Sequence, residues 1–439
     1  MMTGVPYRQL SLWEQLWHRF FPQEIDCSDA INNHSLTCGN SGVGKTSKLK
    51  GDVWEGLHTE DNMLILDTHK ELFDSIAPMA IKLGVQPDEI LFIDPTSPQY
   101  GHIIIDPLRG VEPYVAVDAL LAVCRAIWLT SWGERMADCL RHLLLVLINL
   151  NLPLSEGLPF LQDDAIHKFM MSKVNDLELE TFWAYFFRYH RPDIESTRNK
   201  LSFLLNPLIK PMFDRVGSTI DFYEAFKHGK IVAINLSRNY FKDDSSRGFL
   251  AAVLISMVYN ALLQRENDKE KRPLMMFLDE VHEYYIPEII NNILTGGRKY
   301  GAGLKMYTQS LGHFKPHDLD IIFSTIGSIC SFQVGFNDAR RLVDEMFTFR
   351  NDEIVKHQEH DIFGRYGEKK YHSAGEQRQH ALAELMEQAQ REVLVRIKKR
   401  QGNETYIGRV ADLPEFKVSP QEEDAYRRES ARHHGYTNP

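Results

Sequence analysis

Residues 39–46 read GNSGVGKT, a complete match to the phosphate-binding pattern GxxxxGK[ST]. SLTC precedes the motif and can form a short buried strand, and SKLKGDVWEGL after it can begin a helix, which is the context that the motif requires. Backbone N–H groups of such a loop, with the positive end of the helix dipole, bind phosphate groups. The predicted nucleotide-binding residues are Gly39, Asn40, Ser41, Gly42, Val43, Gly44, Lys45, Thr46 and Ser47.

Two residues of this loop have side chains suited to nucleotide chemistry. Lys45 is expected to reach the β- and γ-phosphates and to serve as a catalytic residue, and Thr46 is expected to bind Mg²⁺ through its hydroxyl group. The motif therefore predicts ATP and Mg²⁺ as cofactors.

The second half of the site is predicted far downstream, in PLMMFLDEVHEYY from Pro273 to Tyr285. Five apolar residues run into adjacent carboxylates, as in a central parallel strand that delivers acids to the ligand-binding edge of a sheet. Asp279 is expected to hold Mg²⁺ through water, and Glu280 to polarise the attacking water, a role that only a hydrolase needs. The alternative is a buried strand whose acids cap a helix. Asp67, in MLILDTHKEL, lacks a second acid and predicts a neighbouring strand.

A further strand candidate, LKMYTQS, ends in Thr308 and Gln309, a polar pair suited to sensing the γ-phosphate. TGGRKYGAG places Arg298 in a predicted glycine-rich turn, from which it would stabilise transition-state charge on a neighbouring subunit's nucleotide. The alternative for Arg298 is a surface residue in a flexible loop. His282 follows the acidic pair, but HEYY lacks the HExxH spacing of a zinc site. We therefore interpret His282 as a helix-start residue.

The remaining pattern predicts an α/β fold. Between residues 114 and 228 apolar residues recur at i, i+3, i+4 and i+7, which indicates helices. Near-continuous apolar runs elsewhere indicate strands buried on both faces, and a late hairpin is predicted to turn near Gly402. The strand candidates are residues 63–67, 90–94, 102–106, 230–237 and 327–335. We therefore expect a mostly parallel central sheet with an inserted all-α domain.

The predicted domain organisation has four parts. SLWEQLWHRFF has apolar residues at helical spacing and predicts a docking helix, with a membrane-surface anchor as the alternative. The charged C-terminal stretch is expected to be mobile or to bind a neighbour. The predicted boundaries are 1–30 for the docking helix, 31–113 and 229–416 for the P-loop ATPase domain, 114–228 for the all-α domain and 417–439 for the C-terminal tail.

Composition excludes several classes of protein. The sequence has 60 acidic and 50 basic residues, a formal net charge of -10, which argues against a chain coated by nucleic acid but leaves room for a local basic channel. The 5 scattered cysteines contain no CxxC pair, as expected in a reducing cytosol. The sequence shows no signal peptide and no apolar run of membrane-spanning length, so a cytoplasmic location is expected.

The ordered motifs resemble the HerA–FtsK superfamily of P-loop motors, and most closely the TraG/TraD-type coupling ATPases of conjugation and type IV secretion. The resemblance covers residues 33–416. MLILDTHKEL is similar to the family's strand that ends in aspartate, and IDPTSPQYGHIIIDPL to its aspartate-proline strand. SWGERMADCLRHLLLVL resembles the start of its all-α domain, and LDEVHEY followed by GGRKYGAGLKMYTQS resembles its acidic, arginine and glutamine series.

This resemblance implies a RecA-like P-loop NTPase that assembles as a homo-oligomeric ring, a hexamer, and translocates DNA. It implies that Lys45, Thr46, Asp279, Glu280 and Gln309 come from one subunit and Arg298 from the next. Two departures concern subfamily placement. The coupling proteins carry N-terminal transmembrane helices that this sequence lacks, which implies a membrane partner or a soluble relative, and their Lys-Gly-Glu turn is replaced by THKE at residues 68–71.

Three functions compete at this point. The first is a DNA translocase, whose channel would use basic residues that contact phosphates without reading sequence. The second is a secretion-type ATPase that handles protein substrates, and the third is a partner-gated NTPase scaffold, for example for a nuclease. The channel candidates are Lys299, Lys305, Arg340 and Arg341, each with a solvated loop as its alternative.

Overall fold

In the computed structural model, the described residues are 2–6, 23–24, 34–59, 61–128, 131–241, 243–349, 355–360, 366–371, 373–400 and 402–436. The predicted docking helix SLWEQLWHRFF lies outside these ranges. The chain divides into two compact units. Unit 1 comprises Met1–Gly56, Phe277–His282 and Gly303–Glu415, and unit 2 comprises Leu57–Met276, Glu283–Ala302 and Phe416–Pro439. The domain boundaries predicted from the sequence stay a prediction.

Unit 1 is built on a mixed sheet with the strand order β2-β1-β13-β12-β9-β3-β8. β3 is parallel to both of its neighbours, β8 and β9, whereas β12, β13 and β1 extend the sheet in antiparallel fashion. The strands are β1 (Met2–Pro6), β2 (Gln23–Glu24), β3 (Ser35–Cys38), β8 (Ala302–Thr308), β9 (Ser328–Ser331), β12 (Glu392–Lys399) and β13 (Gly402–Val410). The late hairpin predicted from the sequence is the pair β12 and β13.

The helices of unit 1 and a separate hairpin complete this part of the chain. They are α2 (Lys45–His58), α13 (Pro316–Thr325), α14 (Phe336–Met346), α15 (Ala374–Glu387) and the strands β10 (Val355–His360) and β11 (Tyr366–Tyr371). β7 (Leu274–Leu278) runs from unit 2 into unit 1 and ends at the acidic pair.

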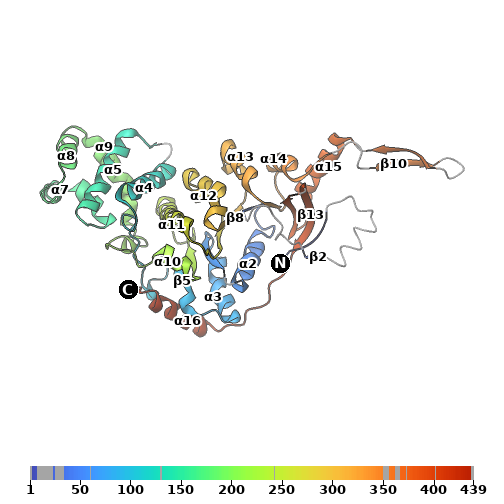
Figure 1. Cartoon of the computed structure of the whole chain (residues 1–439), viewed down its shortest axis with the longest axis horizontal. Helices are drawn as coiled ribbons and strands as arrows, with labels where there is room; N and C mark the ends of the chain where they lie inside the picture. Colours follow the sequence, from blue (N-terminus) through green and yellow to red (C-terminus); the bar gives the residue numbers. More distant parts are fainter. Residues whose placement is uncertain are drawn as a thin grey trace. The chain divides into compact units, whose positions relative to one another are not determined.

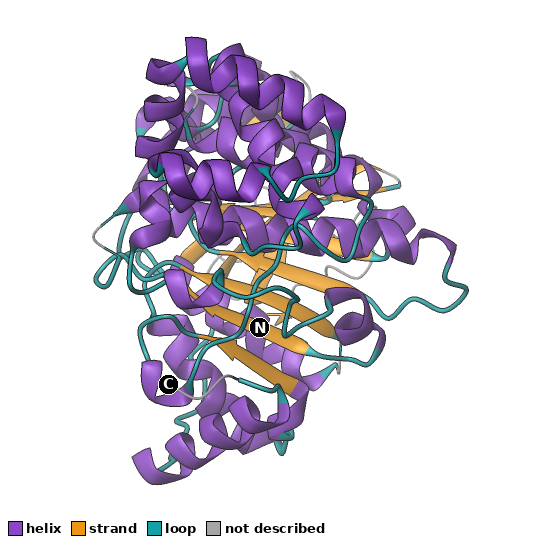
Figure 2. Cartoon of the chain, turned by 90° about the vertical axis from the view of Figure 1, so that its left-hand side faces the viewer, coloured by secondary structure: helices purple, strands orange, loops and turns teal. Residues whose placement is uncertain are grey.

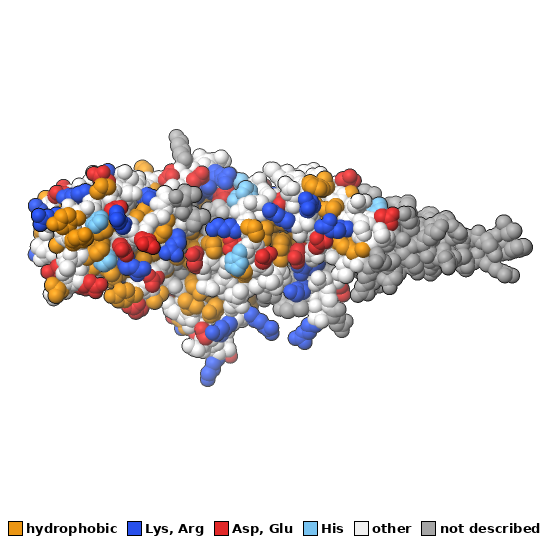
Figure 3. All heavy atoms as spheres, turned by 90° about the horizontal axis from the view of Figure 1, so that it is seen from above, with side chains coloured by type: hydrophobic (Ala, Val, Ile, Leu, Met, Phe, Trp, Pro, Cys, Tyr) orange, Lys and Arg blue, Asp and Glu red, His pale blue; other side chains and the backbone are white. Residues whose placement is uncertain are grey.

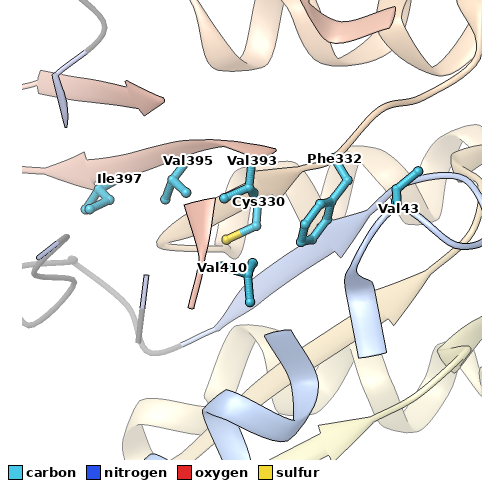
Figure 4. Close-up of a cluster of buried hydrophobic side chains, with 7 residues drawn as sticks. All are labelled: Val43, Cys330, Phe332, Val393, Val395, Ile397 and Val410. Atoms are coloured by element: carbon cyan, nitrogen blue, oxygen red, sulfur yellow. The ribbon is translucent and has the colours of Figure 1, made fainter. Parts of the chain in front are cut away.

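One apolar cluster joins the phosphate-binding loop to the antiparallel side of unit 1. Phe332 lies between Val43 of the loop and Cys330 of β9 (Figure 4). The cluster also contains Val393, Val395, Ile397 and Val410 from β12 and β13. Burial of such side chains stabilises the fold by about 25 cal/mol per Å² of apolar surface removed from water. The loop is therefore anchored in the core of unit 1.

Unit 2 contains three parallel strands in the order β4-β6-β5, namely β4 (Asn62–Asp67), β6 (Ile231–Asn235) and β5 (Ile90–Ile93). Every residue of these strands is buried, as predicted from their continuous apolar runs. Figure 2 shows strands flanked by helices. The parallel core and the α/β class predicted from the sequence are confirmed.

One strand prediction was wrong, because residues 102–106 form no element of the sheet in unit 2. The backbone N–H of Ile105 instead donates to the carbonyl oxygen of Met212 at 2.7 Å, and that of Ile104 donates to the Thr219 hydroxyl at 2.8 Å. Ile103, Ile104 and Ile105 are buried all the same. A run of apolar residues indicates that a segment is buried. Whether the segment is a strand depends on whether its backbone N–H and C=O groups bond to a neighbouring strand.

Between Pro113 and Lys227 the described residues contain helices and no strand. These helices are α4 (Pro113–Ile127), α5 (Glu134–Asn149), α6 (Gly157–Gln162), α7 (Asp164–Met171), α8 (Leu177–Tyr189), α9 (Arg191–Leu201) and α10 (Phe222–Lys227). Several of them lie together at the left of Figure 1. Trp183 is 1% exposed, and its ring meets that of Phe160 edge-on at 4.8 Å between centroids. Aromatic packing of this kind gives the helices a core of their own.

Three further helices in unit 2 are α3 (Glu71–Leu83), α11 (Asp244–Gln264) and α12 (Pro287–Tyr300). α11 with the turn after it, Asp244–Asn267, is the one helix among the described residues that is long and apolar enough to cross a membrane. Because 72% of its most apolar window is buried inside the fold, it is placed as a core helix.

The C-terminal stretch differs from the mobile tail that its charge predicted. Residues Pro420–His433 form α16, which packs on α3 and β5 of unit 2. Arg427 is 7% exposed and lies over the rings of Phe73 and Phe92, at 4.9 Å from each centroid. Ser430 donates its hydroxyl to the carbonyl oxygen of Ile90 at 2.5 Å. The high share of charged residues suggested a mobile tail. It did not predict this packed helix, because an arginine can bury its stem and guanidinium plane against aromatic rings.

Candidate nucleotide site

The phosphate-binding loop follows β3 directly. Cys38, the last residue of β3, lies opposite Thr308 of β8 on one side and Ser331 of β9 on the other. Gly39 admits no side chain, because a Cβ there would lie 2.6 Å from the Cβ of Phe332. Gly44 has φ of +122°, a conformation that side chains rarely adopt. The loop then enters α2 at Lys45, so the helix N-terminus points its N–H groups at the loop.

The ammonium group of Lys45 lies over the loop. It donates to the carbonyl oxygens of Gly39 at 2.8 Å and Asn40 at 2.9 Å. Burial lowers the pKa of Lys45, while the carboxylates of Glu280 and Asp279 act in the opposite direction. The structure thus brings Lys45 into the field of both predicted acids.

Glu280 is held in an unusual conformation at the end of β7. It is 3% exposed and has φ of +45°, which is strained for a residue with a side chain. Its Oε2 accepts the backbone N–H of Gln309 at 3.1 Å. Asp279 beside it is 8% exposed. A strained backbone and a buried carboxylate with a fixed orientation are common among the acidic residues of functional sites.

His282, predicted as a helix-start residue, lies in the short 3-10 helix Val281–Tyr284 and also contacts residues of this site. His282 Nδ1 lies 3.5 Å from Glu280 Oε2 and 3.3 Å from Thr308 Oγ1. Its ring stacks on that of His313, with centroids 4.0 Å apart and 8° between planes. Thr308, paired with Cys38 at the start of the loop, and Gln309 lie at the predicted strand tip, and their role in sensing the γ-phosphate stays a prediction. The position of His282 two residues after Glu280 was the only signal in the sequence.

Beneath the loop, a buried polar cluster connects α2 to β8. Lys48, 4% exposed, donates to Asp52 at 2.5 Å, and Tyr307 also donates its hydroxyl to Asp52. Burial alone would raise the pKa of the Asp52 carboxyl, but the charges of Lys48 and Lys305 outweigh it and lower the pKa. Tyr307 lies on β8 directly before Thr308, so its hydroxyl joins the predicted sensor strand to the ion pair of α2. Sequence reasoning missed it, although Lys48 and Asp52 have the i,i+4 spacing of a helical pair.

Arg298 lies in unit 2, whereas the phosphate-binding loop lies in unit 1. The predicted glycine-rich turn is wrong, because Gly296, Gly297 and Arg298 form the last turn of α12, and Gly301 ends the helix with φ of +68°. The Arg298 side chain is exposed. Within the described residues its guanidinium has no ion-pair partner. A guanidinium in this state is available to another molecule.

The oxygen atoms at this site match the requirements of a hard cation. The Thr46 hydroxyl and the Asp279 carboxylate are the ligand types that Mg²⁺ prefers, with water and phosphate completing its shell. No group of three or more His, Cys, Asp or Glu side chains in the described part of the chain could hold a metal without such help. The arrangement suits phosphate-bound magnesium and provides a carboxylate that can orient a nucleophile.

Comparison with known proteins supports the resemblance seen in the motifs. Residues 195–317 match the family model of type IV secretory system conjugative DNA transfer proteins. Comparison with curated protein sequences finds no match.

Solved structures share the fold over most of the chain. The conjugative coupling protein TrwBΔN70 in an unbound form aligns with a TM-score of 0.57 at 15% identity, covering 87% of this chain and 85% of that one. TrwB in complex with ADP and Mg²⁺ gives 0.58 at 15% identity, covering 96% and 97%. VirB4 of Thermoanaerobacter pseudethanolicus gives 0.57 at 13% identity, covering 90% and 94%. The predicted RecA-like fold with a helical part is therefore confirmed.

The histidine that precedes β3 predicts a pH dependence of stability. Burial, with the charge of Lys305, lowers the pKa of His34 from 6.5 to about 4, and its Nδ1 accepts the backbone N–H of Leu304 at 2.9 Å. The unfolded chain therefore binds the proton first as pH falls. His34 stabilises the fold fully above pH 6.5, and its contribution should fall by about 2 kcal/mol at pH 5.

The measurement is the free energy of unfolding at pH 7.5 and pH 5. His34→Asn keeps an acceptor for Leu304 and should reduce the loss between the two pH values, whereas the exposed His317→Asn should leave it unchanged. His167, whose pKa burial also lowers to about 4, contributes to the remaining loss. An identical pH dependence in wild type and His34→Asn would contradict the prediction.

Proposed function

We propose that this chain is an ATP-hydrolysing motor of the conjugative coupling-protein type, which moves DNA. The observation that supports it best is the phosphate-binding loop, on which Lys45 contacts the carbonyl oxygens of Gly39 and Asn40, in the same unit as the buried acids Asp279 and Glu280. This site occurs in a chain whose residues 195–317 match a DNA-transfer family. The TrwB structures with ADP and Mg²⁺ and with a non-hydrolysable ATP analogue support ATP and Mg²⁺ as the ligands.

Each residue of the loop has a proposed task. The N–H groups from Gly39 to Ser47 bind phosphate oxygens, and Lys45 exchanges its contacts with Gly39 and Asn40 for the β- and γ-phosphates. Thr46 and Asp279 would hold Mg²⁺, which when bound neutralises the charge that develops on the phosphates. The phosphoryl group is thereby fixed in one position relative to Glu280.

Glu280 is the proposed general base. Its carboxylate is shielded from bulk water and oriented by the Gln309 backbone N–H, so that one oxygen remains to accept a hydrogen bond from the attacking water. His282 lies close to both Glu280 and Thr308, so a movement of Thr308 at the end of β8 can change the position of the Glu280 carboxylate. The Gln309 side chain is proposed to sense the γ-phosphate.

Two variants separate binding from hydrolysis. Lys45→Ala removes the phosphate contact and should weaken ATP binding severely. Glu280→Gln preserves shape but cannot accept a proton, so it should bind ATP like wild type and lose hydrolysis by about a hundredfold or more. Equilibrium binding and steady-state phosphate release measure the two steps. Hydrolysis by Glu280→Gln at the wild-type rate would remove Glu280 from the role of base.

DNA as the substrate rests on the family match rather than on surface charge. Acidic and basic side chains are interspersed on the face shown in Figure 3. Lys299 pairs with Glu266, and Arg341 lies 3.9 Å from Asp338. Arg340 lies over the exposed ring of Phe336. Lys305 is half-buried on β8, whereas Arg340 is exposed, so Arg340 is the channel candidate proposed for phosphate contact.

The motor proposal is tested by hydrolysis with and without single- and double-stranded DNA. A DNA translocase should hydrolyse ATP several-fold faster with DNA, since contact with the strand drives its cycle, and Glu280→Gln should remain inactive. The strand form that stimulates identifies the substrate. Hydrolysis that is indifferent to both forms would favour a secretion-type ATPase for protein substrates, and negligible turnover with intact binding would favour a partner-gated scaffold.

Assembly into a homo-oligomeric ring, of six subunits as in the family resemblance, is proposed because Arg298 can then act in trans. Its exposed guanidinium on α12 would neutralise charge on the next subunit's nucleotide. Mixing Arg298→Ala with Glu280→Gln subunits places an intact Glu280 opposite an intact Arg298 at some interfaces, so hydrolysis should reappear. The control mixes Arg298→Ala subunits with the double variant Glu280→Gln/Arg298→Ala, which forms no interface with both groups intact. If no ratio of the two inactive variants restores hydrolysis, the trans role fails.

The proposed location is the cytoplasm, with contact to the inner membrane through a partner protein. The proposed docking helix and the all-α part are the regions available for such a partner.

A further inference from the structure

A short turn of unit 1 lies directly against the phosphate-binding loop. The backbone N–H of Arg391 donates to the carbonyl oxygen of Val43 at 2.7 Å. The side-chain amide of Gln390 donates to the carbonyl oxygen of Gly42 at 3.1 Å. A Cβ on Gly44 would lie 3.2 Å from the Cα of Arg391. The loop and this turn, separated by more than three hundred residues, therefore form one surface.

The conformation of Arg391 is strained and firmly held. Its φ is +67°, in the left-handed region that favours glycine. Its carbonyl oxygen accepts the backbone N–H of Val410 at 3.0 Å, and the Glu392 side chain accepts that of Ala389 at 2.9 Å. Glycine would satisfy the same backbone bonds without strain. An arginine here is consistent with a task for its side chain.

The sheet order determines which end of a nucleotide would face this turn. β3 lies between β8 and β9, and β8 carries the tip at which Gln309 holds Glu280. On the other side, β9 is followed by antiparallel β12, which begins at Glu392, right after Arg391. In a nucleotide whose γ-phosphate points toward Glu280 on the β8 side, the nucleoside lies at the opposite end of the phosphate chain, and Arg391 is the residue that contacts the loop from the β9 and β12 side.

We propose that Gln390 and Arg391 contact the nucleoside, the ribose and base, of the nucleotide bound at the loop; this rests on the function proposed above. The Arg391 guanidinium pairs with Asp412, and both side chains are accessible, at 36% and 80% exposure. A guanidinium plane can stack on a base, and the paired carboxylate holds it in place. The two residues determine affinity for the nucleoside, while the loop binds the phosphates.

The test compares a ligand that contains a nucleoside with one that contains only the two phosphates. Isothermal titration measures the binding of ADP and of inorganic pyrophosphate to the full chain. Arg391→Gly removes the side chain and relieves the backbone strain, and Arg391→Ala removes it without that relief. Arg409→Ala, an exposed arginine on β13, is the matched control.

Both Arg391 variants should bind ADP about tenfold more weakly, equal to about 1.4 kcal/mol, and should bind pyrophosphate within about twofold of wild type. Arg391→Gly should melt no lower than wild type, since glycine accepts the left-handed conformation. Arg409→Ala should change neither affinity.

Unchanged ADP affinity in both variants would overturn the inference. An equal loss of pyrophosphate affinity, or a drop in the melting temperature of Arg391→Gly, would also overturn it, because the turn would then only support the loop. Absence of ADP binding by the wild-type chain would instead refute the proposed function, and Lys45→Ala defines that baseline.

Discussion

The pairing of β3 with a parallel strand on each side is the constraint on which the nucleotide site depends. Because Cys38 is in register with Thr308 and with Ser331, the loop leaves the sheet between two strand ends of different chemistry. One side carries the acidic pair and the polar strand tip. The other carries Phe332 and, through β12, Gln390 and Arg391. A shift of one residue in either pairing would move these side chains to the opposite face of the sheet.

Two of the four described non-glycine residues with positive φ lie at this site. Glu280 and Arg391 both adopt positive φ without being glycine, and each is held by hydrogen bonds to a neighbouring strand or loop. The buried pair of Lys48 and Asp52, joined by Tyr307, holds the helix after the loop against β8. Breaking one partner of such a pair is costly, because it leaves a buried charge uncompensated. The loop is thus supported at its base and on both sides, which suits a site that must keep its geometry through many cycles.

Unit 2 shows how the same chain builds a separate core. Helices between Pro113 and Lys227 pack around Trp183 and Phe160. The C-terminal helix α16 packs on Phe73 and Phe92, which come much earlier in the sequence, through the guanidinium of Arg427. Charged composition therefore gives little indication of order when the charged side chain also has a large apolar or planar surface. The same unit contains Arg298, whose side chain is exposed at the end of α12.

The sequence by itself determined the loop, the acidic strand end, the parallel strands and the helical segment, because each depends on local spacing and on continuous apolar runs. Glycines at residues 39 and 44, the acids after LMMFL and the strand tip at Thr308 needed no tertiary information. Only the tertiary structure decided that residues 102–106 pair outside the sheet and that His282, Tyr307 and Arg391 belong to the site. Those contacts join segments separated by up to several hundred residues. The pattern of apolar and polar residues within one segment does not specify which distant backbone group or carboxylate that segment will contact.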